Sequence, residues 1–114
     1  MRKIVYIAGP LTAETNKETA RNVFNAIRAG QAVASGGFTP IVPHLSWYME
    51  VDGWALTHEE WIDIDLALID KADMIVMLDG WEDSKGSCQE YDHANEKGMP
   101  IYFGVDHLIT EVRL

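Results

Sequence analysis

The stretch Met74–Glu90, MIVMLDGWEDSKGSCQE, decides how this chain folds. It opens on an apolar run, Met74–Leu78, which is the pattern of a strand buried on both faces. The chain then turns through Gly80 and restarts as a predicted helix at Ser84, a residue type that favours the N-cap position. A strand, a short turn and a helix N-terminus can together seat an anionic or sugar-bearing ligand. Glu90 would bring a carboxylate to that place.

Strand-like and helix-like segments alternate outward from this stretch along the whole chain. Strands are predicted at Ile4–Ala8, Phe38–Val42, Asp73–Leu78 and Ile101–Phe103, and helices at Thr15–Ser35, Thr57–Ala72, Ser84–Lys97 and Asp106–Val112. The alternation predicts one α/β domain over residues 1–114, with a mostly parallel sheet of four to five strands and helices on both faces. This is a three-layer, flavodoxin- or Rossmann-like architecture. Ligands bind such sheets beyond the carboxyl ends of the strands.

The bulk composition excludes several classes of function. Lys and Arg number 9 against 18 Asp and Glu, so the formal net charge is −9. We therefore expect no nucleic-acid partner, because nucleic-acid phosphates require cationic neutralisation. The single cysteine, Cys88, excludes an internal disulfide and a multi-cysteine zinc site. No apolar stretch is long enough to span a bilayer and no signal peptide opens the chain, so we expect a cytoplasmic protein without a membrane partner.

Asp65 stands out among the acidic residues of the predicted helix Thr57–Ala72. Helical spacing places it on the face of that helix which carries the apolar residues Trp61, Ile64, Leu68 and Ile69. Asp63 instead shares a face with other acids and is expected to be solvated. A carboxylate on an apolar face costs free energy unless something pairs with it. Asp65 could cap the N–H groups of a neighbouring loop or serve a binding site, and the spacing does not decide between these interpretations.

In the helix that follows Ser84, an apolar stripe of Cys88, Tyr91 and Ala94 is predicted, with Glu90 at its margin. Glu90 could be a rim glutamate with a solvated head or a member of a site. Glu90 and His93 have the spacing of a metal-binding pair, but the chain offers no second pair of this kind. We therefore expect no metal, and no cofactor is indicated.

The first turn of the same helix holds Ser84, Gly86 and Ser87. Its free N–H groups and the helix dipole would favour a phosphate, but Ser84 could equally be a simple N-cap. Gly9 and Pro10 follow the first strand without a dinucleotide fingerprint or a P-loop lysine, so a dinucleotide or NTPase interpretation is weak.

Aromatic residues and one histidine fall in or near the predicted loops. His44 could contact a base or a sugar, or be an ordinary loop histidine. Trp47, Trp54 and Trp81 could stack on a nucleobase or bury a subunit interface, and both interpretations stay open. Tyr6 in its apolar strand is the pattern of a core residue whose hydroxyl reaches the strand end.

The order of these residues resembles the nucleoside 2-deoxyribosyltransferase-like superfamily over nearly the whole chain. The matching elements are Tyr6-Ile7-Ala8-Gly9-Pro10, then Asp65-Leu66, then Ser84-x-Gly86-x-x-x-Glu90, and finally Ala94 with Gly98-x-Pro100. The resemblance implies that residues 1–114 form one domain of this superfamily. It implies that Glu90 is the nucleophile that attacks the anomeric carbon of a nucleoside. Asp65 would contact the sugar or assist proton transfer, and Tyr6 would lie close to the reacting ribose.

Ser84 places the resemblance nearer one branch of that superfamily. Deoxyribosyltransferases carry an aspartate at this position, whereas 2′-deoxynucleoside 5′-monophosphate N-glycosidases carry a serine that holds the 5′-phosphate. Those hydrolases also have a polar phosphate-binding loop where this chain has Pro10 and Leu11. The resemblance thus implies cleavage of the N-glycosidic bond of a nucleoside 5′-monophosphate. Deoxyribosyl transfer between bases, non-catalytic nucleotide binding and a structural role for the tryptophans are the alternatives.

The expected site therefore combines three catalytic residues with a set of substrate contacts. The catalytic residues would be Glu90, Asp65 and Tyr6, and the substrate contacts would be Gly9, Pro10, His44, Trp81, Ser84, Gly86 and Ser87. The expected partner is a small nucleoside or nucleotide. Because members of the superfamily are commonly dimers or larger, we also expect a homodimer or higher homo-oligomer.

Overall fold

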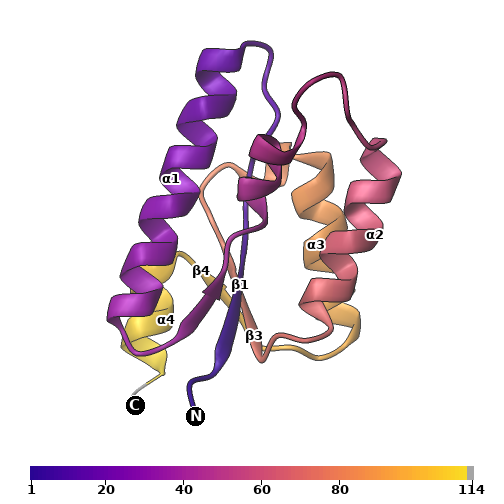
Figure 1. The fold of residues 1–114 in the computed structure, drawn as a ribbon. Coiled ribbons are helices and arrows are strands. Elements are labelled where there is room, and N and C mark those ends of the chain that lie inside the picture. Colours follow the sequence, from indigo (N-terminus) through magenta and orange to yellow (C-terminus); the bar gives the residue numbers. More distant parts are fainter. Residues whose placement is uncertain (113–114) are drawn as a thin grey trace.

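Four parallel strands form one sheet with helices on both faces (Figure 1). The computed structural model describes residues 1–112. The strands are β1 (Ile4–Ala8), β2 (Thr39–Ile41), β3 (Met74–Met77) and β4 (Ile101–Phe103), in the order β2-β1-β3-β4. The α-helices are α1 (Asn16–Ser35), α2 (His58–Ile69), α3 (Lys85–Glu96) and α4 (Val105–Glu111), and the 3₁₀ segments are η1 (Pro43–Met49) and η2 (Trp81–Asp83). The predicted α/β fold class is confirmed.

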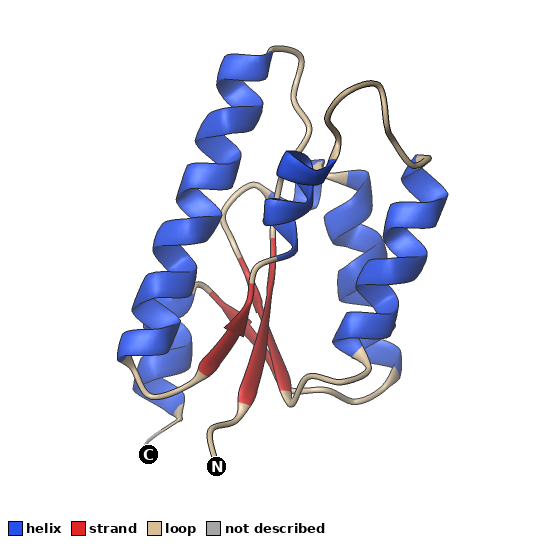
Figure 2. Cartoon of the chain, in the orientation of Figure 1, coloured by secondary structure: helices blue, strands red, loops and turns tan. Residues whose placement is uncertain are grey.

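The two central strands, β1 and β3, supply both halves of the core. Alternate residues of a strand point to opposite faces of the sheet, so Val5 and Ile7 pack against α1 and α4. Tyr6 and Ala8 point to the other face, where α2 and α3 lie (Figure 2). The register pairs Tyr6 with Ile75, and every residue of β3 is buried. This alternation brings the Tyr6 hydroxyl to the layer that α2 and α3 form.

Most predicted element boundaries hold within a few residues, with two informative differences. Helix α2 ends at Ile69, before the predicted Ala72, because the chain turns there to enter β3. Helix α4 begins at Val105 after Gly104, so Asp106 lies inside its first turn and is not its cap.

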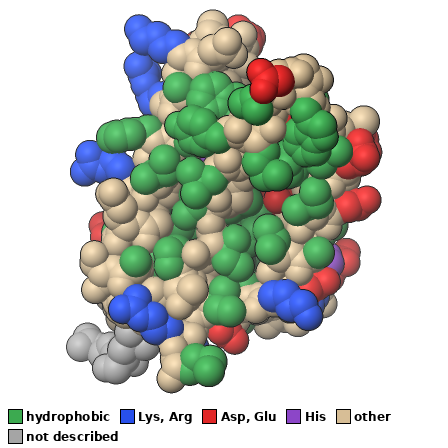
Figure 3. All heavy atoms as spheres, in the orientation of Figure 1, with side chains coloured by type: hydrophobic (Ala, Val, Ile, Leu, Met, Phe, Trp, Pro, Cys, Tyr) green, Lys and Arg blue, Asp and Glu red, His purple; other side chains and the backbone are tan. Residues whose placement is uncertain are grey.

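The segment after β2 forms η1 and lies beside the carboxyl ends of the strands (Figure 1). Large apolar side chains on and after η1 stay exposed; these are Leu45, Tyr48, Met49, Val51 and Trp54. Figure 3 shows apolar side chains gathered over this part of the molecule, with acidic side chains along the α2 side. No helix within residues 1–112 has both the length and the apolar character needed to cross a membrane.

Candidate active site

A cavity of about 370 Å³ opens beyond the carboxyl ends of the strands, between η1, α2 and α3. Its wall takes residues from the turn after β1, from η1 and the segment that follows, from α2, and from the start of α3. These residues are Gly9, Leu11, Thr12, Pro43, His44, Ser46, Trp47, Glu50, Leu56, His58, Trp61, Ile62, Asp65, Ser84, Gly86, Ser87 and Glu90. Its position is the one that parallel sheets of this kind use for ligands.

Glu90 lies on the floor of this cavity and is 5% exposed. The Tyr6 hydroxyl, itself buried, donates a hydrogen bond to Glu90 Oε2. The prediction that Glu90 sits at the margin of an apolar stripe is wrong, because Glu90 is one of the three buried residues of α3, with Ser87 and Ala94. The reason is the phenol of Tyr6, which satisfies the carboxylate inside the protein and allows α3 to turn its polar side inward.

Asp65 reaches the same cavity from α2 and is half-buried. The buried residues of α2 are Ile62 and Ile69, whereas Ile64 is 42% exposed, contrary to the predicted face. Asp65 nevertheless points inward, because it lies three residues after Ile62 and four before Ile69 on the helix. The charge of its carboxyl opposes the ionisation of Glu90.

The electrostatics of the floor favour protonated acids. The pKa of Glu90 is raised to about 8, mainly by burial and also by the nearby Asp65 charge, although the Tyr6 hydrogen bond opposes the shift. Burial likewise raises the pKa of Asp65, to about 7. The pKa of Tyr6 is far above its ordinary value, because burial and the Glu90 charge both oppose a phenolate. The two carboxyls therefore titrate as a pair that holds one proton near neutral pH, with Tyr6 as a permanent donor.

The start of α3 forms the wall next to Glu90. Ser84 caps the helix, with its hydroxyl accepting from the N–H of Ser87 at 3.3 Å. The hydroxyl of Ser87 is buried and has no partner among the described residues. A side chain at Gly86 would crowd α2, since a Cβ there would stand 3.3 Å from Ile62 Cδ1. The first turn of α3 therefore presents backbone N–H groups and an unused hydroxyl to the cavity.

His44 is 3% exposed and lies against the turn after β1. Its Nε2 is 3.0 Å from the carbonyl oxygen of Gly9, which can only accept, so Nε2 carries the hydrogen. Its Nδ1 has no partner among the described residues. Burial lowers the pKa of His44, so the ring is neutral and Nδ1 is an unused acceptor. Gly9 itself sits close to the end of β3, and a Cβ there would stand 2.8 Å from Leu78 Cβ.

Two of the expected substrate contacts, Pro10 and Trp81, do not line the cavity. The Trp81 ring stacks on Tyr91 with centroids 4.7 Å apart and packs into the core between the sheet and α2 and α3. Pro10 lies against Gly80, where a Cβ would stand 3.3 Å from Pro10 Cγ. Both side chains gain more by burial against neighbouring apolar groups than by facing an open cavity. The other expected contacts, which are Gly9, His44, Ser84, Gly86 and Ser87, all line it.

His93 pairs with Asp70 at 2.7 Å rather than with Glu90. Within residues 1–112 no group of three or more His, Cys, Asp or Glu side chains is placed to hold a metal ion.

Among the lining residues that were not expected in the site, three carry polar or aromatic groups that could meet a ligand: Glu50, His58 and Trp61. Trp61 was assigned to the apolar face of its helix. His58 opens α2, and its Nε2 lies 3.0 Å from Gln89 Oε1 on α3. Glu50 lies in a segment without periodicity, so no local pattern marks it. The only feature of the sequence that marks this segment is the cluster of aromatic residues around Glu50.

Comparison with known proteins places the chain in a family. The family described as a domain of unknown function, DUF4406, matches residues 3–103. No curated protein matches the chain. Among solved structures, a 2-deoxyribosyltransferase from the psychrotolerant bacterium Bacillus psychrosaccharolyticus is similar, with a TM-score of 0.62 and 21% identity over 88% of this chain and 70% of that one. This likeness establishes the fold of a 2-deoxyribosyltransferase, and the chain belongs to the DUF4406 family.

Proposed function

We propose that the protein breaks the N-glycosidic bond of a nucleoside or nucleotide, with Glu90 as the nucleophile. The observation that carries the proposal is the meeting of Tyr6, Asp65 and Glu90. These three residues come from β1, α2 and α3, and they converge where a ligand would sit beyond the strand ends. The shared fold with a 2-deoxyribosyltransferase supports the same class of chemistry.

The proposed reaction has two steps, and the second returns the protein to its starting state. In the first, a Glu90 oxygen bonds to the anomeric carbon while the bond from that carbon to the base breaks. The bonding electrons leave with the base, which takes a proton from Asp65. In the second, water attacks the anomeric carbon, Asp65 takes back a proton from that water, and the Glu90 ester bond breaks.

The paired carboxyls suit these roles, since the reaction needs one ionised nucleophile and one protonated acid. The pair near neutral pH supplies one proton between the two groups. In the free protein the shared proton favours Glu90, whose pKa is about 8 against about 7 for Asp65, and the Tyr6 hydrogen bond opposes this by stabilising the Glu90 carboxylate. Positive charge that develops on the sugar next to Glu90 would stabilise its ionised form and leave the proton on Asp65.

The start of α3 supports a 5′-monophosphate as the substrate. Free N–H groups at a helix N-terminus favour an anion, and Ser84, Gly86 and Ser87 line the cavity there. The unpartnered Ser87 hydroxyl adds a donor.

A second candidate, transfer of a deoxyribosyl group between bases, is favoured by the charge of the cavity. None of the described residues that line it is Lys or Arg, whereas Glu50, Asp65 and Glu90 are acidic. An uncharged nucleoside fits such a wall better than a phosphate does. Here a second base would replace water in the second step.

The experiment that tests the proposal follows the release of free base by chromatography. Deoxynucleosides and their 5′-monophosphates are incubated with the protein at pH 7, with and without a second free base. Base release from monophosphates alone supports hydrolysis, and appearance of a new nucleoside supports transfer. Binding that raises the melting temperature without any released base would leave a non-catalytic nucleotide-binding protein instead. Release that is unchanged in Glu90→Gln would refute the role of Glu90.

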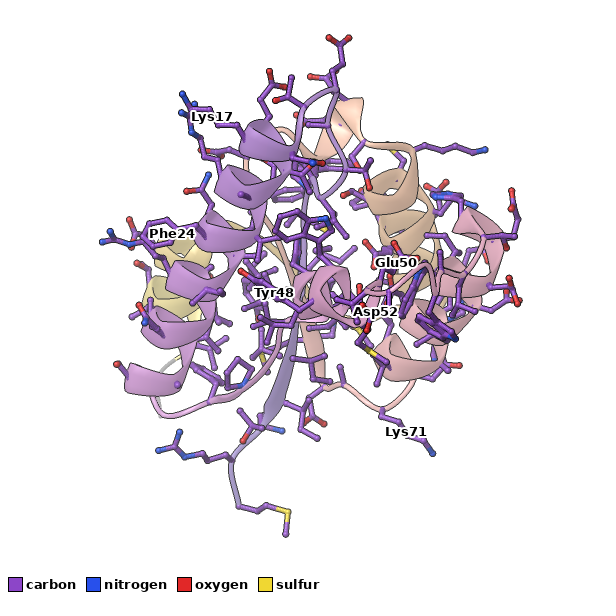
Figure 4. All side chains as sticks on the ribbon, turned by 45° about the horizontal axis from the view of Figure 1, so that its top comes forward. Lys17, Phe24, Tyr48, Glu50, Asp52 and Lys71 are labelled. Atoms are coloured by element: carbon purple, nitrogen blue, oxygen red, sulfur yellow. The ribbon has the colours of Figure 1, made fainter. Side chains whose placement is uncertain are left out.

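Self-association through the face around η1 remains our prediction. The exposed apolar side chains there, Tyr48 and Met49 among them, form the kind of patch that marks a protein contact. Tyr48 lies on η1 toward α1, whereas Glu50 and Asp52 lie toward α2 (Figure 4). The mass by sedimentation should fall to that of one chain in Tyr48→Lys if this face joins two copies. An unchanged oligomer would place the contact elsewhere.

A further inference from the structure

We infer that the mouth of the cavity selects nucleobases that carry an exocyclic amino group, and that Glu50 is the residue that selects them. The inference rests on the proposed function for the class of ligand. It adds specificity for the base, whereas the carboxyls on the floor act on the sugar and do not distinguish one base from another.

Glu50 is held in place through one of its two carboxylate oxygens. Its Oε2 accepts from the N–H of Leu56 at 3.0 Å and from Trp61 Nε1 at 2.9 Å. None of the described residues donates to Oε1. Glu50 follows η1 directly and lines the cavity, in the space between η1 and α2 (Figure 4). The side chain is thus fixed by two donors and presents one free acceptor to a ligand.

Both donors also keep Glu50 ionised. The hydrogen bond from Trp61, and then that from Leu56, lower the pKa of the carboxyl, so it is an anion throughout the neutral range. A carboxylate without a proton can only accept hydrogen bonds. The free oxygen therefore binds a donor and repels an acceptor.

Two tryptophans give the mouth flat apolar walls. Trp47 comes from η1 and Trp61 from α2, and both line the cavity. Each ring is steadied by an aromatic neighbour: Trp47 lies 5.4 Å from Tyr48 and Trp61 lies 6.2 Å from Trp54 between centroids. Planar heterocycles stack on such faces, whichever base they belong to. Stacking on the two rings would bind any base. The groups on the edge of the base that faces Glu50 would then decide which base is preferred.

The discrimination follows from one functional group. Cytosine and adenine carry an amino group where uracil and hypoxanthine carry a carbonyl oxygen. The amino group donates to the Glu50 oxygen, whereas the carbonyl oxygen would face it as a second acceptor. A site built to accept from a donor disfavours an analogue that lacks it, and we expect a preference of about tenfold or more.

The test uses the two matched pairs, deoxycytidine with deoxyuridine and deoxyadenosine with deoxyinosine, each also as the 5′-monophosphate. The readouts are kcat/KM for base release and the rise in melting temperature at saturating ligand. The wild-type protein should favour the amino member of each pair by about tenfold or more in kcat/KM. It should also be stabilised more by that member.

Glu50→Gln should reverse this preference rather than merely weaken it. The N–H groups of Leu56 and Trp61 would hold the amide oxygen, so the amide nitrogen would face the ligand and donate to a carbonyl. Trp61→Phe keeps an aromatic wall but removes one of the two donors, so it should reduce the preference without reversing it. Glu59→Gln is the matched control. Glu59 is exposed on α2, the helix that carries Trp61, and it does not line the cavity. This substitution should leave the preference unchanged.

The readouts separate this inference from the proposed reaction. If no base is released but the amino members still bind more tightly, and Glu50→Gln reverses this, the selection stands and the reaction falls. If both members of each pair react equally fast, the reaction stands and the selection by Glu50 is overturned. Equal binding of both members, or no binding of any of them at millimolar concentration, overturns the selection as well.

Discussion

The floor and the mouth of the cavity are built in opposite ways. The floor is formed by Asp65 and Glu90, and Tyr6, which does not itself line the cavity, binds Glu90 from the core cluster between the sheet and helices α2 and α3. The mouth, formed by Trp47, Glu50 and Trp61, is partly exposed and stands outside both core clusters.

Substitutions in the two regions should therefore have different consequences. Buried carboxyls gain chemical reactivity from desolvation, and the folded chain bears the cost of ionising them. Exposed groups at the mouth bear no such cost. Changes at the floor should therefore alter both activity and stability, whereas changes at the mouth should alter the choice of ligand and leave stability nearly unchanged.

The largest expected effect is on catalysis at the floor. Glu90→Gln keeps the volume and a hydrogen-bond partner for Tyr6, but it removes the nucleophile. We expect base release to fall by at least about a thousandfold, measured by chromatography under saturating substrate. Glu96→Gln, an exposed change on the same helix, is the control. A loss of less than tenfold in Glu90→Gln would show that another group attacks the sugar.

The next largest expected effect concerns Tyr6, the residue of β1 that donates a hydrogen bond to Glu90. Tyr6→Phe removes the hydrogen bond that lowers the pKa of Glu90, so more of the protein holds Glu90 protonated at neutral pH. The acidic limb of kcat/KM should move to higher pH by about one to two units. A pH–rate profile of both proteins measures this. A profile with an unmoved acidic limb would mean that Tyr6 serves packing alone.

A third effect links the floor to stability. The folded chain raises the pKa of Glu90 above its unfolded value, so it binds a proton there that the unfolded chain releases. This contribution is fully present below the unfolded pKa and is lost as the pH rises through the folded pKa. The melting temperature of the free protein should therefore fall between pH 5 and pH 9, and Glu90→Gln should reduce that fall by about 5 °C. If the melting temperature falls equally with pH in both proteins, groups other than Glu90 cause the fall.

The smallest effect on stability belongs to the mouth. Glu50→Gln retains acceptors for Leu56 and Trp61, and its side chain is exposed, so the melting temperature should change by less than about 3 °C at any pH. Calorimetry of the same samples used for the ligand pairs measures this. A loss as large as that of a core substitution would mean that Glu50 holds the fold together, and the contrast between floor and mouth would fail.

The fold and part of the floor follow from the sequence for local reasons. The apolar runs at Ile4–Ala8 and Met74–Leu78, each ended by a turn, specify strands, and Ser84 marks the start of the helix that carries Glu90. The burial of Glu90 does not follow, because its partner Tyr6 is 84 residues away in the chain. Only the pairing of parallel strands brings the two together.

Apart from Trp47, a candidate for stacking on a base, the mouth could not be predicted from the sequence, for a different reason. Residues 43–57 have no helical or strand periodicity to show which side chains point inward. The bond from Trp61 to Glu50 joins a helix to an irregular segment and depends on the path of that segment. Trp81 shows the same limit, since its ring turned into the core and stacked on Tyr91 rather than on a ligand.

The role of Glu90 as the nucleophile is tested by the mass of the protein after reaction with a 2′-fluoro analogue of its best substrate. Fluorine next to the anomeric carbon slows both steps through the charge that develops there, which allows the intermediate to accumulate. If Glu90 attacks the sugar, the mass should increase by one fluorosugar, located on the peptide that contains Glu90, and Glu90→Gln should show no increase. Release of base with an unmodified Glu90 would contradict this role.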